Sequence, residues 1–135
     1  MVRKINNICK ITFYPLANIS SDVFRPGLDT VSFEGTGLTL NMTSATFTEE
    51  DLGGSECVQS FAGVVTDTSH DTSQVIFDMC AVFGLLAMTL STGETLVAGS
   101  PEFPLVLQCQ REGRPQSFRL AFKRNSPERA KYRVL

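Results

Sequence analysis

The chain contains no tryptophan, only one histidine, and no two cysteines close together in the sequence. The four cysteines, Cys9, Cys57, Cys80 and Cys109, form no Cys-x-x-Cys pair, so the usual patterns of zinc binding and thiol redox chemistry are excluded. Cys80 and Cys109 fall within apolar runs that we interpret as strands, where a thiol packs as a small hydrophobic group. We therefore expect four reduced thiols and no disulfide.

The sequence also lacks a hydrophobic segment that would direct the chain to a membrane. Arg3 and Lys4 are not followed by the apolar stretch of a signal peptide. The longest uncharged apolar run, residues 79–90, is shorter than the roughly 20 residues that a helix needs to cross a bilayer. The sequence therefore predicts a protein without membrane contact that stays inside a cell, or leaves it without a secretion signal.

Charged residues are fewer than usual, at 19% of the chain against about one quarter in a typical soluble domain. Hydrophobic residues make up 42%, and ten of them are phenylalanine. A length of 135 residues predicts one domain, spanning residues 1–135, with a sizeable core. This apolar composition also predicts that part of the surface is covered by a partner or by further copies of the chain.

Apolar residues recur with a period of two along much of the chain, most clearly between residues 74 and 122. Leu105, Leu107 and Cys109 alternate with Val106, Gln108 and Gln110, which gives that segment one apolar face and one wetter face. Connectors with glycine and proline mark the chain reversals. The expected strands are residues 8–16, 31–34, 38–42, 57–66, 75–82, 84–90, 94–98, 104–110 and 116–122. Together they predict an all-β fold, a single-domain β-sandwich or β-barrel of antiparallel strands with at most one short helix.

Two segments allow a second interpretation. Residues 75–90 also fit one face of a helix capped by Ser73, although Gly84 and the β-branched start of the segment favour strands. Residues 48–54 fit one helical turn, because Thr48 can cap it and acidic residues follow, but they fit a plain acidic loop equally well.

The apolar parity changes between the segments 31–34 and 38–42. Two glycines, Gly35 and Gly37, lie at the change, which predicts a β-bulge or a tight hairpin. The second segment then presents an uncharged polar face formed by Thr39, Asn41 and Thr43.

The net charge of −2 conceals a strong segregation of charge along the chain. The first ten residues carry +3, and residues 11–110 carry −11 because twelve carboxylates face a single arginine, Arg25. Residues 111–135 carry +6, from eight basic and two acidic residues. Both ends are therefore basic and the middle is acidic.

The basic C-terminal region is the main candidate for a functional surface. Complementary patches of opposite sign favour contacts between copies of a chain, so we predict an electrostatic subunit interface. Its predicted residues are Arg119, Lys123, Arg124, Arg129, Lys131 and Arg133. Residues 125–135 are expected to form a basic C-terminal arm, either free or ordered on a neighbour. Two alternatives stay open: phosphate contacts with a nucleic acid, and neutralisation of the acidic strands within one fold.

No reactive constellation stands out in the sequence. His70 could act as a base with Asp67 or Asp71 and a nearby serine, Ser69 or Ser73, but sequence neighbours rarely converge into a triad, and a solvated polar loop is the alternative. Asp67, Asp71 and Asp78 lack the spacing of a calcium loop. Nothing singles out a catalytic pair among the remaining candidate carboxylates, Glu34, Glu49, Glu56 and Glu94. The sequence predicts no enzyme activity, catalytic residue, metal site, cofactor or small-molecule substrate.

One region resembles a known class of proteins. It comprises Leu85–Leu90, the Thr92-Gly93 turn, Leu96–Ser100, Glu102–Leu105 and the closing strand Phe118–Phe122. This strand-turn-strand pattern resembles small β-rich virion proteins from the structural modules of tailed bacteriophages and prophages. The resemblance implies a β-sandwich or β-barrel subunit that assembles into rings of the tail tube, tail terminator, neck or hub, and it implies no catalytic residue.

The sequence therefore predicts a non-enzymatic structural protein of a phage tail or head–tail connector, a homo-oligomer located in the virion and assembled in the host cytoplasm. Its expected partners are copies of itself, other virion proteins, and DNA that passes through a carboxylate-lined channel without specific binding. The alternative is a monomeric β-sandwich that binds carbohydrate or peptide. The lack of tryptophan, with Tyr14 and Tyr132 as the only tyrosines, counts against a sugar-binding face.

Overall fold

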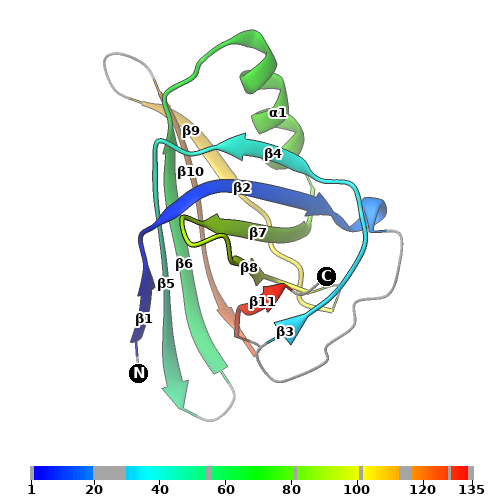
Figure 1. Ribbon diagram of the computed structural model, residues 1–135, viewed down its shortest axis with the longest axis vertical. Helices are drawn as coiled ribbons and strands as arrows, with labels where there is room; N and C mark the ends of the chain where they lie inside the picture. The colour runs from blue at the N-terminus through cyan, green and yellow to red at the C-terminus, as the bar shows by residue number, and fades with distance from the viewer. Residues whose placement is uncertain are drawn as a thin grey trace.

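A computed structural model of the chain describes residues 2–19, 30–53, 56–80, 82–100, 102–112, 117–127 and 129–133. These residues form two β-sheets packed face to face, with one α-helix at one end of the sandwich (Figure 1). The predicted all-β sandwich with at most one short helix is confirmed.

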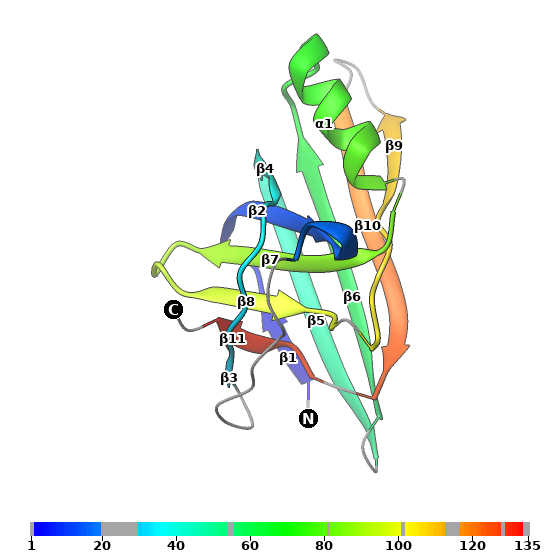
Figure 2. The same cartoon turned by 90° about the vertical axis from the view of Figure 1, so that its right-hand side faces the viewer.

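Sheet A has five strands and sheet B has six. In spatial order, sheet A contains β1 (Val2–Ile5), β5 (Ser44–Gly53), β6 (Glu56–Val65), β10 (Ser117–Ser126) and β9 (Gln108–Glu112). Sheet B contains β3 (Thr30–Val31), β11 (Lys131–Arg133), β8 (Thr95–Ala98), β7 (Gly84–Leu90), β2 (Ile8–Pro15) and β4 (Leu38–Asn41). The helical elements are a 3-10 turn, η1 (Leu16–Asn18), and the helix α1 (His70–Cys80). Every strand pair is antiparallel except β3 with β11, and the strands of the two sheets cross at a steep angle (Figure 2).

The main core lies between the two sheets. Strands β5, β6 and β10 of sheet A contribute alternate residues to it, as the period of two requires. Phe13 of sheet B and Phe47 and Phe61 of sheet A are almost fully buried, and the ring of Phe61 stacks on Phe122 at 6.0 Å between centroids. Burial of such side chains is the main favourable contribution to folding, at about 25 cal/mol per Å² of apolar surface.

A second, smaller apolar cluster covers the opposite face of sheet B. Leu85 and Ala87 of β7 pack there with Phe33, so β7 is buried on both faces. The chain after β3 runs to β4, which is the other edge strand of sheet B. The predicted β-bulge or hairpin at this point is wrong, because Gly35 bridges to Ile19 and the parity changes where the chain passes between the two edges of the sheet.

The strand predicted over residues 75–82 is wrong, because the helix α1 occupies residues 70–80. The residues before it form a local cap: the Ser69 N–H donates to Asp67 Oδ1 at 2.9 Å, and the Ser69 hydroxyl accepts a bond of 3.4 Å from the N–H three residues later. Ile76 and Met79, three positions apart on one helix face, are fully buried in the main core.

Neither helix in the described residues is long and apolar enough to cross a membrane.

Residues 84–90 form the predicted strand, β7, and Gly84 fixes where it begins. A Cβ at Gly84 would lie 2.3 Å from the backbone oxygen of Tyr14. Gly84 and Leu105 also exchange two backbone hydrogen bonds of 2.9 Å. The strand predicted over 104–110 is displaced, since β9 begins only at Gln108 and Leu105 takes part in this isolated bridge.

Residues 48–53 belong to β5, so both the helical turn and the acidic loop considered for them are wrong. Thr48 pairs with Ser60, and Asp51 with Cys57, in the hairpin of β5 and β6. The buried side chains of β5 occupy alternate positions, at Ala45, Phe47 and Glu49. The carboxylate of Glu49 therefore lies on the same inward face as the apolar side chains.

The C-terminal region is part of the sandwich. Strand β10 continues to Ser126, and β11 lies within sheet B between β8 and β3. The described residues of the segment 125–135 are therefore not an arm, because Tyr132 pairs with both Leu96 and Thr30.

Candidate functional site

The six residues of the predicted subunit interface do not form one surface. Arg119 and Lys123 share the solvent-exposed face of β10, as expected from their spacing. The Arg124 side chain lies on the other face of this strand, where Nε donates to Gln59 Oε1 at 3.2 Å and Nη1 donates to the Phe103 backbone oxygen at 2.7 Å.

The remaining three residues lie at or after the turn that follows β10. Arg129 forms an ion pair with Asp51, and Lys131 is partly buried in β11. The Arg133 guanidinium lies 4.3 Å from the ring centroid of Phe33 and donates to the Tyr14 hydroxyl at 2.7 Å. These contacts hold Arg124, Arg129 and Arg133 within the fold, where Arg129 has an acidic partner, and leave Arg119 and Lys123 exposed.

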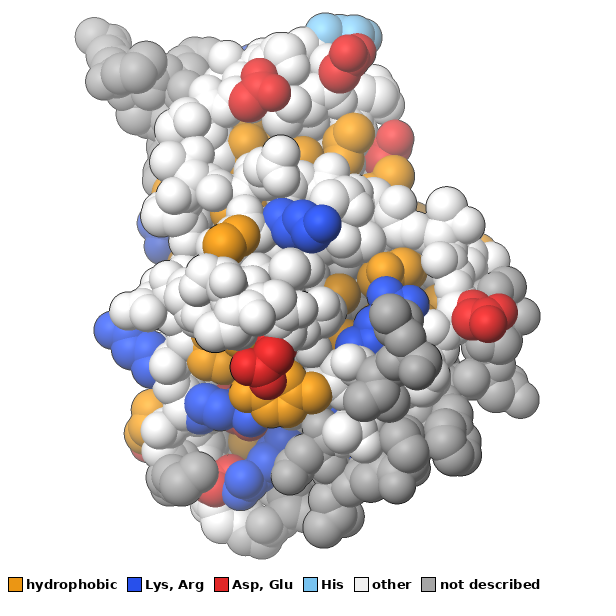
Figure 3. Space-filling model, viewed as in Figure 1, with side chains coloured by type: hydrophobic (Ala, Val, Ile, Leu, Met, Phe, Trp, Pro, Cys, Tyr) orange, Lys and Arg blue, Asp and Glu red, His pale blue; other side chains and the backbone are white. Residues whose placement is uncertain are grey.

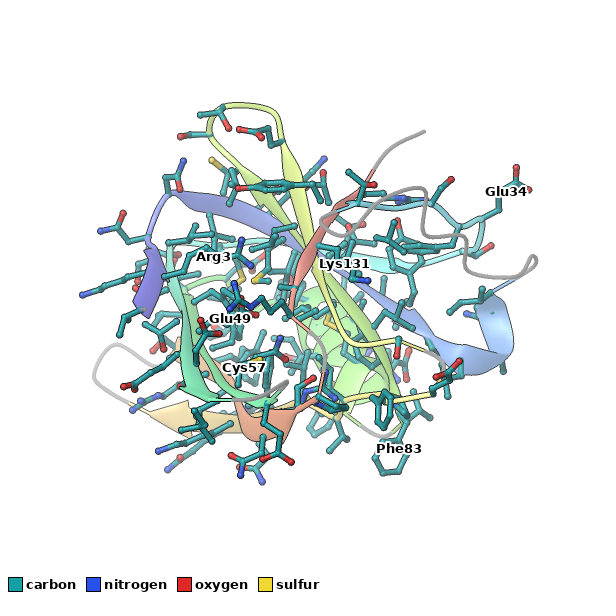
Figure 4. All side chains as sticks on the ribbon, turned by 90° about the horizontal axis from the view of Figure 1, so that it is seen from below. Arg3, Glu34, Glu49, Cys57, Phe83 and Lys131 are labelled. Atoms are coloured by element: carbon teal, nitrogen blue, oxygen red, sulfur yellow. The ribbon has the colours of Figure 1, made fainter. Side chains whose placement is uncertain are left out.

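A buried polar cluster, which sequence reasoning missed, surrounds Glu49. The Glu49 side chain is 4% exposed. Its Oε1 accepts a hydrogen bond of 2.9 Å from Arg3. Its Oε2 accepts hydrogen bonds of 2.9 Å from Gln59 and 2.8 Å from the Ala130 N–H. Seen from below, Arg3, Glu49 and Cys57 lie near the centre of the molecule (Figure 4). The cluster joins β1, β5, β6 and the segment before β11, and all of its contacts are those of a structural network.

The acidic residues of the middle of the chain do not gather on one face of the described structure. Asp67, Asp71 and Asp78 lie in and before α1, Glu49 is buried, and Glu50 lies on the outside of sheet A. Figure 3 shows acidic side chains spread from the top to the bottom of one face, with basic side chains across its middle and lower half. On the face that Figure 3 shows, the described acidic side chains therefore do not form one continuous surface.

The loop residues considered for catalysis lie before and at the start of α1. Asp67 supports the Ser69 cap of α1, and hydrogen bonds from the Thr72 hydroxyl and from Ser69 hold the pKa of its carboxyl below the usual value. His70 is exposed as the first residue of the helix. Burial raises the pKa of the Cys57 thiol, and Glu49 raises it further. Within the described residues, no group of three or more His, Cys, Asp or Glu side chains is placed to hold a metal ion.

An exposed apolar groove lies at the open side of sheet A, and we call it the edge groove. It has a volume of about 320 Å³ and is lined by Phe83, Pro104, Leu105, Val106, Gln108, Phe122, Lys123 and Arg124. Strand β9 pairs with β10 only as far as Ala121, so the groove begins where that pairing stops. Phe83 is 59% exposed at its rim and Val106 is 38% exposed, which is unusual for large apolar side chains grouped together.

A second hollow, of about 360 Å³, is lined mainly by polar side chains between β4 and the start of α1. Thr39, Asn41 and Thr43 contribute to it, so the predicted uncharged polar face is confirmed as exposed. The hydroxyls of Thr43 and Thr66 are 3.0 Å apart at its wall. Its lining contains hydroxyl, amide and carboxylate groups and no aromatic ring.

The described site therefore consists of two surfaces, the edge groove and the polar hollow, and one structural network around Glu49. The sequence contained no signal for the groove, because Phe83 and Val106 lie within apolar segments that predict buried strands. Comparison of the chain with protein-family models, with curated proteins and with solved structures finds no match in any of the three.

Proposed function

We propose that this protein is a non-enzymatic structural subunit of a phage tail or head–tail connector, which assembles into a homo-oligomeric ring or tube as a tube, terminator, neck or hub protein. The observation that carries the proposal is the edge groove. Phe83 and Val106 of its lining expose apolar surface, and surface of this kind marks a protein–protein contact.

The arrangement of sheet A also supports assembly. Among the described strands its two edges are β1 and β9, and β10 extends beyond the point where its pairing with β9 stops. Open edges favour contacts between chains, and two different edges on opposite sides favour head-to-tail contacts that close into a ring. Arg119 and Lys123, exposed beside the groove, would add an electrostatic component.

Under this proposal the partners are copies of the chain and other virion proteins, and the protein is assembled in the host cytoplasm and located in the virion. DNA would pass through the ring without specific binding.

The test compares two phenylalanines of equal exposure. Phe83 at the groove is 59% exposed and Phe77 on α1 is 58% exposed, so Phe83→Ser and Phe77→Ser remove similar exposed surface at different places. We expect rings or tubes in negative-stain electron microscopy, and a matching mass in light scattering, from the wild type and from Phe77→Ser but not from Phe83→Ser. A wild-type chain that is a monomer at every concentration and salt would contradict the proposal.

The second candidate function, a monomeric module that binds carbohydrate or peptide, has one observation in its favour. The polar hollow presents several hydroxyl groups, including those of Thr43 and Thr66, of the kind that bind sugar hydroxyls. Titration of the isotope-labelled chain with a set of soluble glycans tests it by nuclear magnetic resonance. Saturable shifts at Thr43 and Thr66, in a chain that stays monomeric, would replace the assembly proposal.

A further inference from the structure

The last residues of β5 and the first residue of β6 hold an exposed leucine among carboxylates. Leu52 is 53% exposed, and Glu50 and Glu56 are exposed on either side of it in the sequence. We call Glu50, Asp51, Leu52 and Glu56 the acidic tip. Figure 1 shows that β5 ends at the end of the sandwich opposite α1. Val2, which is 61% exposed, pairs with Glu50, so β1 adds apolar surface beside the tip.

A β-bulge presents Leu52 to solvent. The register of the β5–β6 hairpin shifts between Asp51 and Gly53, so Leu52 is the extra residue of the bulge. Gly53 has a φ of +91°, in the left-handed region that glycine adopts without strain. Arg129 forms an ion pair with Asp51, which ties this end of β5 to the turn after β10. The backbone of the bulge therefore places Leu52 outside the core.

The edge groove has the properties of a surface that could receive the acidic tip. Phe83 lies at the periphery of the molecule and points outward (Figure 4), and Val106 in the lining is also exposed. Its volume of about 320 Å³ is at the lower end of the range of small-ligand sites, roughly 300–1,000 Å³, so it can hold one leucine side chain. Lys123 lines the groove, and Arg119 is exposed on the same face of β10.

The acidic tip and the edge groove are complementary in polarity and in charge. The tip carries an exposed leucine with three carboxylates, and the groove has an apolar lining with basic side chains beside it. Complementary charge speeds association and fixes the register of a contact. The tip and the groove are different surfaces of one chain, so a contact between them is heterologous and can close into a ring or extend into a tube.

We propose that the acidic tip of one copy docks in the edge groove of the next copy. Leu52 contacts Phe83 and Val106, and the tip carboxylates lie near Arg119 and Lys123. This inference rests on the proposed function, because it names the surface that fills the groove in the assembled ring or tube.

The first experiment compares Leu52→Ser with Phe83→Ser by light scattering and negative-stain electron microscopy. Leu52 is exposed, so Leu52→Ser should melt within about 2 °C of the wild type. The loss of its apolar contact should raise the dissociation constant between copies by roughly 10- to 100-fold. We therefore expect both variants to be monomers at concentrations where the wild type and Phe77→Ser form rings or tubes.

A mixture of the two variants tests whether the tip and the groove meet each other. Phe83→Ser keeps an intact tip and Leu52→Ser keeps an intact groove, so the mixture contains one complete contact. We expect a 1:1 pair in sedimentation velocity and no ring, because the second contact of each pair is defective. Folded variants that are monomers alone and remain monomers in the mixture would overturn the inference.

A charge exchange provides a second, independent test. Glu50→Lys/Glu56→Lys should lose assembly, because the tip then carries the same sign of charge as the groove. The addition of Arg119→Glu/Lys123→Glu to the same chain should restore assembly, because the signs are again opposite. A chain with all four substitutions that folds and stays monomeric would contradict the contact.

The outcomes separate the inference from the proposed function. If Leu52→Ser forms the same rings as the wild type, the inference is overturned and the assembly proposal stands. If the wild type is a monomer at every concentration and salt, both are overturned.

Discussion

Replacement of Glu49 by glutamine tests the network that holds the basic ends of the chain against its acidic middle. The substitution preserves the size of the side chain and removes its charge. The carboxylate accepts three hydrogen bonds, from Arg3, Gln59 and the Ala130 N–H. A glutamine has one acceptor oxygen and one donor nitrogen, so in either orientation its NH₂ group faces at least one donor.

The magnitude follows from burial. Removing one member of a fully buried ion pair costs about 3–5 kcal/mol. Here Glu49 is 4% exposed, but Arg3 is 30% exposed, so water offsets part of the loss. The glutamine oxygen also keeps some of the hydrogen bonds. We expect Glu49→Gln to lower the free energy of unfolding by about 2–3 kcal/mol, and the melting temperature by about 6–12 °C.

Urea unfolding followed by far-ultraviolet circular dichroism measures this change, since the chain has no tryptophan for fluorescence. The control is Glu50→Gln, because Glu50 is the next residue of β5 and is exposed on the opposite face. It should change the free energy of unfolding by no more than about 0.5 kcal/mol. Equal effects of the two substitutions would refute the network as a source of stability.

Two further predictions concern backbone packing and the helix cap. Gly84→Ala should destabilise the fold by at least about 2 kcal/mol, because the new Cβ would meet a backbone oxygen at 2.3 Å. Gly63→Ala should cost less than half as much in the same thermal melt, because the atom at 2.3 Å there is the flexible end of a methionine side chain. The pKa of Asp67 is lowered by hydrogen bonds, chiefly from Thr72, so the cap contributes stability above the ordinary carboxyl pKa of about 3.9 and loses it as the pH falls through the lower folded value. Asp67→Asn should therefore reduce the melting temperature at pH 7 but not near pH 2, and an equal reduction at both pH values would contradict the charge-dependent cap.

The period-two pattern predicted much of the sandwich. Its prediction was wrong for the segment before Gly84, because this glycine supported two interpretations. Residues 84–90 were predicted as β7 with the observed bounds. The helix before it does not show in the pattern, because Gly84 counts against one continuous helix over residues 75–90. Gly84 instead marks the beginning of a strand that packs too closely on β2 for a Cβ. The capping residues Asp67 and Ser69 contained the missing signal for the helix.

The polar cluster could not be predicted because sequence patterns treat charged residues as solvent-facing. Glu49 continues the inward alternation of Ala45 and Phe47, but its burial depends on Arg3, 46 positions away, and on Gln59. The edge groove could not be predicted either, because it depends on where the pairing of β9 with β10 stops. Contacts of this range become visible only when the strand order is known.

The proposed assembly would give the segregated charge a second role besides ion pairs within the fold, and this leads to a final prediction. Arg129 lies against Asp51 in an exposed ion pair, of a kind that contributes about 0–1 kcal/mol. Arg119 and Lys123 lie on the outer face of β10 with no ion pair to another residue among those described. We expect Arg119→Glu/Lys123→Glu to leave the melting temperature within about 2 °C of the wild type, and to abolish the oligomer in light scattering. Arg129→Glu places two carboxylates together, so it should lower the melting temperature and leave the oligomer intact. The reverse result, with assembly lost in Arg129→Glu and kept in the double variant, would show that the contact between subunits uses the basic residues of the turn after β10 instead.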